Sequence, residues 1–324
     1  MLASKAPSQC RLGTSRELSA RASHAGRWGQ RASLPRFDAR LKGGRRTDRS
    51  SQLSVAASTK RAVVVLPGLG NASGDYDDFV QELEEYDMSV TVAKVRRIDW
   101  LRNAAGLVDI NYWKGTLEPR PTVDWYLNAM TAAVEEAMEE SGSDQVCLLA
   151  HSAGGWLARV WMLENGVESV DSMITLGSPL QPPPEGVVDQ TRGILTWVTE
   201  NSPGAFHPEV RYVCLTGKFL EGRALGDGDA SWPARLTGLG YKQVYGSAEV
   251  WGDGITPVPV GQLEGAACVE LEGVYHSPLG AAEGRPWYGT PEILEQWVDY
   301  IDQPKPKVRV GSLLQKAKQA LGVK

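Results

Sequence analysis

Cysteine is scarce in this sequence, with four residues in 324, and the positions of Cys10, Cys147, Cys214 and Cys268 are far apart. Such wide spacing argues against a disulfide framework and against a zinc site built on thiolates. The last three cysteines each lie in an apolar, strand-like run, so we expect buried thiols in a reducing compartment. The sequence also lacks any run of 18 apolar residues, and we therefore expect no transmembrane helix.

Positive charge is deficient outside the amino-terminal segment. The whole chain carries a net charge of −5, but residues 1–57 contain ten Arg, two Lys and three acids, which leaves residues 58–324 at −14. Nucleic-acid binding needs a positive surface that can neutralise phosphates. An acidic body of this kind therefore argues against a nucleic-acid partner.

Residues 1–57 are basic, rich in Ser and Ala, and without a sustained hydrophobic period. This composition is typical of a disordered organelle transit peptide. Val55-Ala56-Ala57 resembles a plastid processing site, so we expect cleavage near Ala57 and a location in the chloroplast, in the stroma or at a thylakoid or envelope surface. Mitochondrial import and a basic tail that is retained stay open as alternatives. No apolar signal core follows Met1, so we do not expect secretion.

Buried apolar runs alternate with helical patterns from residue 61 onward. Strands are predicted over residues 61–66, 89–95, 146–150, 170–176, 211–216 and 267–271, and helices over residues 77–86, 122–138 and 291–301. We expect Thr122 to cap the second helix and residues 96–119 to form an irregular connection beside the site. The alternation predicts one α/β domain over residues 58–302, with a mostly parallel, doubly wound sheet and helices on both faces. Right-handed crossovers then gather the loops that follow the strands at one edge of the sheet.

A serine lies in the short, glycine-rich turn between a strand-like run and a helical pattern. The run that ends at Ala150 is followed by His151-Ser152-Ala153-Gly154-Gly155, and a helical pattern begins at Trp156. The small residues two before and two after the serine permit a tight turn, in the form A-x-S-x-G. The helix that follows directs N–H groups and the positive end of its dipole toward Ser152, which favours developing negative charge. This stretch therefore predicts a serine nucleophile.

The strand, turn and helix around Ser152 resemble the nucleophile elbow of the α/β-hydrolase superfamily, especially its lipases and esterases. The resemblance covers roughly residues 60–300. Among the lipase-like hydrolases that these motifs resemble are relatives of the glycosylphosphatidylinositol deacylases. Gly252-Asp253-Gly254-x-x-Pro257-Val258 resembles the turn that carries the acid of the triad, and His276 follows the last predicted strand, where the family has its base. The resemblance therefore implies a catalytic triad of Ser152, Asp253 and His276, in the family's chain order.

The resemblance also implies an oxyanion hole and a reaction without a metal or an organic cofactor. The Gly-rich loop over residues 67–74 matches the loop that contributes one backbone N–H, which we assign to Leu69, and the second N–H is that of Ala153. Asp227 and Asp229 are weaker candidates for the acid, because they lie in a presumed insertion. Among the histidines, His151 directly precedes the serine and His207 precedes the acid, so neither fits the order.

The expected activity is hydrolysis of carboxylic esters, with lipid acyl esters as the substrate class, through an acyl-enzyme. Two alternatives stay open: acyl transfer to an alcohol on the same scaffold, and a catalytically silent fold that binds a lipid or a pigment. Residues 180–208 and 217–250 are candidate cap or lid segments. The basic tail at residues 303–324 could lie as an amphipathic helix on an anionic membrane, or it could be a solvated helix. The sequence predicts no oligomeric state.

Overall fold

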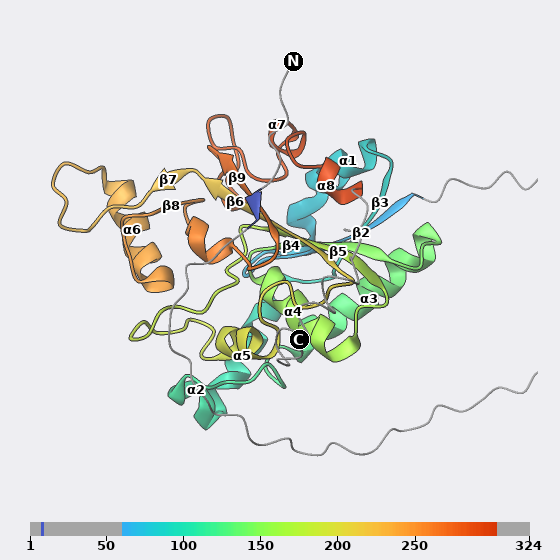
Figure 1. Cartoon of the computed structure of the whole chain (residues 1–324), viewed down its shortest axis with the longest axis horizontal. Helices are drawn as coiled ribbons and strands as arrows, with labels where there is room; N and C mark the ends of the chain where they lie inside the picture. Colours follow the sequence, from blue (N-terminus) through green and yellow to red (C-terminus); the bar gives the residue numbers. More distant parts are fainter. Residues whose placement is uncertain (1–7, 10–59, 303–324) are drawn as a thin grey trace, which may run out of the picture. The chain divides into compact units, whose positions relative to one another are not determined.

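The computed structural model describes residues 8–9 and 60–302, and a seven-stranded sheet forms the centre of this part of the chain (Figure 1). Its strands are β1 (Ser8–Gln9), β2 (Arg61–Leu66), β3 (Met88–Val92), β4 (Val146–His151), β5 (Val170–Leu176), β6 (Arg211–Lys218) and β9 (Ala267–Glu272). The strand order is β1-β9-β6-β5-β4-β2-β3, and every pairing is parallel except that of β1 with β9. This order confirms the predicted doubly wound α/β sheet.

Helices cover both faces of the sheet, which explains why most residues of its parallel strands are buried. The helices are α1 (Asp77–Glu85), α2 (Ile110–Lys114), α3 (Asp124–Ser141), α4 (Ala153–Asn165), α5 (Ile194–Asn201), α6 (Trp232–Tyr245), α7 (Pro291–Leu294) and α8 (Asp299–Asp302). In Figure 1, α1, α7 and α8 lie above the sheet, and α3, α4 and α5 lie below it. Along β2, Val64 and Leu66 belong to one buried cluster and Val63 and Val65 to the other. The alternation of side chains along each strand thus builds two cores.

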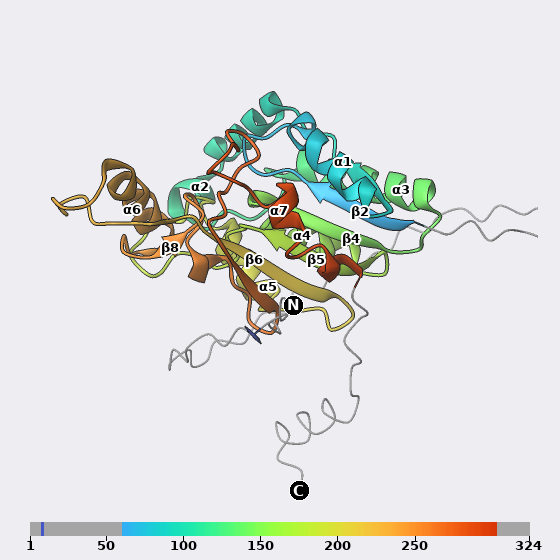
Figure 2. The ribbon, with the colours of Figure 1, turned by 90° about the horizontal axis from the view of Figure 1, so that it is seen from above.

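The insertion between β6 and the acid turn contains a helix where the sequence suggested a loop. It includes β7 (Leu220–Glu221), α6 and β8 (Trp251–Gly252), and β7 pairs with β8 in a small antiparallel sheet. Ser231 caps α6, because its hydroxyl accepts the Ala234 N–H at 3.4 Å. Figures 1 and 2 both show this insert at one end of the sheet, away from α3. Its capped helix makes it an ordered element of the fold.

Residues 96–119, for which we expected an irregular connection, also form helices. A 3₁₀ helix, η2 (Arg97–Val108), is followed by α2, and the prediction was therefore wrong. Local capping explains the difference: the Asp99 carboxylate accepts the Arg96 N–H at 3.0 Å, and the Asp109 carboxylate accepts the Asn111 N–H at 2.8 Å. These short helices have few apolar repeats, so periodicity does not reveal them.

Three further predictions differ from the structure, besides shifts of one to three residues at the ends of other elements. Strand β3 ends at Val92 because the chain turns away, with the Val95 N–H bonded to the Ser73 hydroxyl at 2.7 Å. The cap of α3 is Val123 without a side-chain hydrogen bond, whereas Thr122 is buried, so the predicted Thr122 cap was wrong. The helix expected near Pro291 consists of two short pieces, α7 and α8.

Most of the expected leader and the whole tail at residues 303–324 lie outside the described residues. Ser8 and Gln9 of the expected disordered leader instead form β1, because the edge strand β9 offers free backbone groups for pairing. Cys147 and Cys214 are free and buried as expected, but Cys268 is disulfide-bonded, which corrects the expectation of a thiol there. Within the described part, no helix combines the length and apolarity needed to cross a membrane.

Candidate active site

Ser152 lies on a strained turn between β4 and α4. Its backbone has φ 51° and ψ −121°, a conformation that L-residues rarely adopt, and it is the N-cap residue of α4. Its N–H is anchored to the Leu176 carbonyl at 3.0 Å. A Cβ atom added at Gly154 would lie 2.6 Å from the Leu66 carbonyl oxygen, so the turn needs a glycine at that position. These constraints hold the serine at the junction that the sequence indicated.

Three side chains from distant parts of the chain form one hydrogen-bonded series. The His276 Nε2 atom lies 3.0 Å from the Ser152 hydroxyl oxygen, and the His276 Nδ1 atom lies 2.7 Å from Asp253 Oδ2. Asp253 is fully buried and His276 is nearly so. The structure therefore brings the three predicted residues together at the carboxyl ends of the parallel strands, with an imidazole between a hydroxyl and a carboxylate.

The buried carboxylate of Asp253 accepts hydrogen bonds from its own turn and from a tyrosine later in the chain. The Ile255 and Thr256 N–H groups donate to Oδ1 at 3.0 and 2.7 Å, and the Tyr288 hydroxyl donates to Oδ2 at 2.8 Å. Tyr288 in turn accepts the Gly217 N–H at 2.8 Å. Burial, and next the charge of Asp253, hold the pKa of Tyr288 well above its usual range, so the phenol keeps its proton for this bond. Tyr288 could not be identified from the sequence, because no local motif marks it.

The weaker candidates lie elsewhere. Asp227 and Asp229 belong to the insert, where the Asp227 carboxylate accepts the Asp229 N–H at 3.1 Å. His207 lies between α5 and β6, beside the ring of Phe206. Within residues 60–302, none of these three side chains is hydrogen-bonded to Ser152.

The loop after β2 approaches Ser152 closely enough to supply a backbone donor. A Cβ atom added at Gly68 would lie 2.8 Å from both Ser152 Cβ and His151 Nδ1, so no other residue fits without displacement. Leu69 and Ala153, the two residues assigned to the oxyanion hole, line the same cavity as Ser152. Neither N–H takes part in any hydrogen bond of residues 60–302, so both can donate to a substrate.

A buried histidine links this loop to the loop that carries His276. The Tyr76 hydroxyl accepts the Gly68 N–H at 2.9 Å and lies 2.7 Å from His151 Nδ1, while His151 Nε2 lies 2.8 Å from the His276 carbonyl oxygen. Since Tyr76 receives one proton from Gly68, it donates its own to Nδ1, and His151 keeps its proton on Nε2. Burial, and next the neighbouring His276, lower the pKa of His151 to about 3, so the ring stays neutral. Tyr76 was not identified from the sequence.

A cavity of about 230 Å³ opens beside Ser152, and its walls are largely apolar. It is lined by Leu69, Ser152, Ala153, Trp156, Pro179, Gln181, Pro183, Asp189, Gln190, Thr191, Leu195, Gln243, Val244, Ile255 and Thr256. Both candidate cap segments thus contribute to its wall, residues 180–208 through their first half and residues 217–250 through α6. We call it the acyl cavity.

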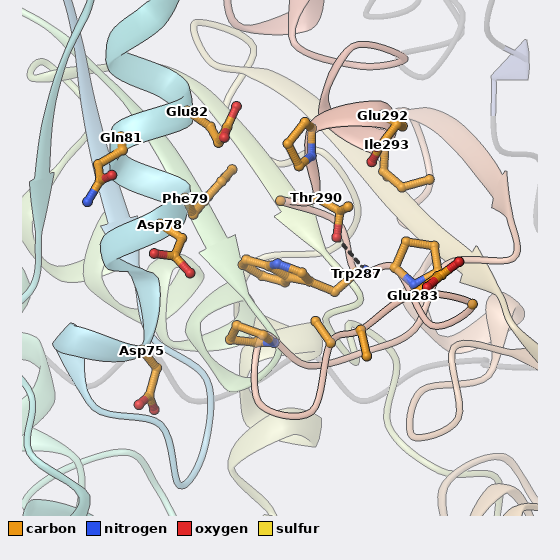
Figure 3. A pocket seen from close by; sticks show the side chains of 17 residues that line it. Asp75, Asp78, Phe79, Gln81, Glu82, Glu283, Trp287, Thr290, Glu292 and Ile293 are labelled. Carbon is orange, nitrogen blue, oxygen red and sulfur yellow. Dashed lines mark hydrogen bonds between the residues drawn. The ribbon is translucent and has the colours of Figure 1, made fainter.

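A larger cavity, of about 870 Å³, lies between α1 and residues 278–293 (Figure 3). None of Ser152, Asp253 and His276 lines it. Trp287 forms part of its wall, and the ring of Trp287 also packs edge-on against His151, with 5.8 Å between centroids. Trp287 therefore lies between this cavity and the histidine. Within the described residues, no group of three His, Cys, Asp or Glu side chains is arranged to hold a metal ion.

One family model and several solved structures are similar to parts of this chain. Residues 122–200, which include the elbow, match the family model of the PGAP1-like alpha/beta domain. No curated protein sequence matches the chain. The mature Bacillus licheniformis lipase BlEst2 is 13% identical, with a TM-score of 0.47, over 76% of this chain and 93% of the lipase. A Listeria innocua gene product is 12% identical, with a TM-score of 0.44, over 76% of this chain and 96% of its own.

The sheet topology and the elbow give this chain an α/β-hydrolase fold, and the match to the PGAP1-like domain lies on the segment that holds the serine.

Proposed function

We propose that the protein is a serine hydrolase that cleaves carboxylic esters through an acyl-enzyme, with Ser152 as nucleophile, His276 as base and Asp253 as the orienting acid. The observation that carries this proposal is the series of hydrogen bonds from the Ser152 hydroxyl through His276 to Asp253. A nucleophile within reach of a base that a third group orients is the recurring arrangement of covalent hydrolysis.

The distances support a specific sequence of proton transfers. His276 Nε2 removes the proton of the Ser152 hydroxyl as its oxygen attacks the ester carbonyl, and Asp253 stabilises the imidazolium that forms. The N–H groups of Leu69 and Ala153 donate to the oxyanion of the tetrahedral intermediate, where one such donor contributes roughly 2.7–4 kcal/mol. His276 then protonates the leaving alcohol, and a water molecule, activated by the same imidazole, releases the acid and restores the serine.

The acyl cavity supports esters with an apolar acyl group as substrates. Its walls are mostly apolar, and its volume of about 230 Å³ suits a single short chain. Each methylene buried there contributes about 0.8 kcal/mol to binding. Lipid acyl esters belong to this class, and the cavity favours those whose acyl chain is short or enters only in part.

Hydrolysis of p-nitrophenyl esters by the purified protein tests the proposal. We expect turnover that is lost in Ser152→Ala, and that persists in Ser277→Ala, a matched control whose hydroxyl only accepts the Leu279 N–H at 3.1 Å. Equal turnover in Ser152→Ala and in the unchanged protein would contradict the proposal. Product analysis with an added alcohol separates hydrolysis from acyl transfer, and absence of turnover with an intact fold would favour a silent binding protein.

We further propose that residues 1–57 direct the protein to the chloroplast and that residues 303–324 attach it to anionic membranes. Both proposals rest on composition, since the first segment is rich in Arg and Ser and the second has six Lys or Arg and no acid. A fluorescent fusion to residues 1–57 tests the first, with mitochondrial fluorescence as the contrary result. Pelleting with anionic liposomes, with and without residues 303–324, tests the second; equal pelleting would refute it.

A further inference from the structure

A third cavity, of about 710 Å³, adjoins the acyl cavity on the side of α6. We call it the side cavity. The two cavities share Gln190 and Gln243 as lining residues, so a molecule that extends from one can reach the other. The side cavity is also lined by Tyr112, Arg192, Leu239 and Lys242. Among the described residues that line it, only Arg192 and Lys242 are charged, whereas residues 58–324 as a whole carry a net charge of −14.

In the part of the chain that the structure describes, the two cations of the side cavity have no carboxylate partner. Neither Arg192 nor Lys242 forms an ion pair within residues 60–302, whereas Arg61, Arg97 and Arg120 each bind a carboxylate. The Arg192 guanidinium instead lies over the ring of Tyr112, 4.8 Å from its centroid, which holds the group in place. Guanidinium and ammonium groups that converge on one cavity without an acid are suited to bind an anion.

The backbone around Arg192 is held in a strained form. Arg192 has φ 61°, which is costly for a residue with a side chain. The turn is fixed because the Asp189 carboxylate accepts the Thr191 N–H at 2.7 Å and the Gly193 N–H at 3.2 Å. The Arg192 carbonyl also accepts the Leu117 N–H at 2.8 Å. These bonds occupy Asp189 with the backbone, and they keep the Arg192 side chain at the cavity wall, next to the acyl cavity.

We propose that the side cavity binds an anionic group of the substrate, so that the preferred substrates are esters with an apolar acyl part and a fixed negative charge in the alcohol part. This inference rests on the proposed function, because it places the scissile bond at Ser152. The acyl group occupies the acyl cavity, and the charged end of the alcohol lies against Arg192 and Lys242. A carboxylate or a phosphate has the required chemistry.

A matched set of esters tests this inference with the unchanged protein. The set comprises 4-(hexanoyloxy)benzoate, its uncharged methyl ester and 4-(hexanoyloxy)phenyl phosphate. We expect the ratio of kcat/KM for the charged ester over the uncharged one to be about tenfold or more, because a hydrogen bond to a charged group contributes enough for such a factor. The ratio should fall as salt is raised from about 0.05 to about 0.5 M, since salt screens exposed charges. The phosphate arm shows whether a dianion is preferred to a carboxylate.

Variants then assign the preference to the two cations. Arg192→Gln should lower the charged-to-uncharged ratio about tenfold, and Lys242→Gln, whose side chain is exposed, about threefold. Lys60→Gln removes the same charge at the start of β2 and should leave the ratio within about twofold. A ratio near one in the unchanged protein, or a ratio that survives in the double variant, would overturn the inference while leaving ester hydrolysis intact. Absence of turnover with every ester would instead overturn the proposed function, and the inference with it.

Discussion

Tyr76 offers a sharp test of the link between the oxyanion loop and the loop that carries His276. Its hydroxyl is the only hydrogen-bond partner of the Gly68 N–H within residues 60–302, and it also bonds to His151 Nδ1. Tyr76→Phe removes this oxygen and leaves the ring, which packs edge-on against Trp287 with 6.0 Å between centroids. The substitution therefore removes two hydrogen bonds and little packing.

The expected cost follows from the two groups that lose their partner. Both lie in the buried interior, and an unsatisfied buried polar group costs about 1–3 kcal/mol. We expect the free energy of unfolding of Tyr76→Phe to fall by about 2–4 kcal/mol. We also expect kcat to fall about tenfold with little change in KM, because the Leu69 N–H acts mainly on the transition state, where about 1.4 kcal/mol corresponds to a factor of ten.

Denaturant unfolding and ester kinetics measure both effects. Tyr86→Phe is the matched control, since Tyr86 ends α1 with a partly exposed ring, and its variant should resemble the unchanged protein in both assays. The reasoning would be refuted if Tyr76→Phe lost less than about 0.5 kcal/mol of stability and retained its kcat, because a bond network that positions the loop cannot be removed without either effect.

Three further predictions concern the elbow, the buried histidine and the acyl cavity. Gly154→Ala should lower the free energy of unfolding by about 1–3 kcal/mol, because the new methyl meets the Leu66 carbonyl oxygen. Gly240→Ala, where no atom lies within 4 Å, should instead raise it by about 0.5–1 kcal/mol, because alanine favours the helix α6. Thermal unfolding of the two variants measures both effects. The pKa of His151 is about 3 in the folded chain, so as the pH falls the unfolded chain takes up this proton before the folded chain does. The free energy of unfolding should therefore fall by up to ~1.4 kcal/mol per pH unit as the pH is lowered from about 6.5 to about 3. The same dependence of stability on pH in His151→Gln would contradict this. Lengthening the acyl chain should raise kcat/KM about fourfold per methylene until the acyl cavity is full, and Val244→Trp should shorten the best chain; an unchanged optimum would show that the chain lies elsewhere.

The sequence predicts the sheet well because its strands carry a strong local signal. β2 and β5 begin and end at the predicted residues, since both are largely buried runs bounded by turn residues. The chain order of Ser152, Asp253 and His276 also placed three candidate residues that the structure brings within hydrogen-bond distance. Their catalytic roles remain a proposal that the experiments above test.

Residues that act through long-range contacts could not be predicted in the same way. Tyr288 donates to Asp253 from 35 positions later, and Tyr76 meets His151 from 75 positions earlier, so only the folded chain shows either contact. The helices at residues 97–114 were missed for another reason, because short, capped segments lack an apolar repeat. A sequence pattern thus marks the nucleophile and its strand, whereas the groups that position the base depend on tertiary packing.

The most direct test of the central claim is labelling by a fluorophosphonate, followed by mass spectrometry of the digested protein. The account predicts one adduct, on the peptide that contains Ser152, and a rate of labelling that falls by orders of magnitude in His276→Ala, because the imidazole 3.0 Å from the hydroxyl removes its proton. An adduct on another residue, or an equal rate in His276→Ala and the unchanged protein, would contradict it.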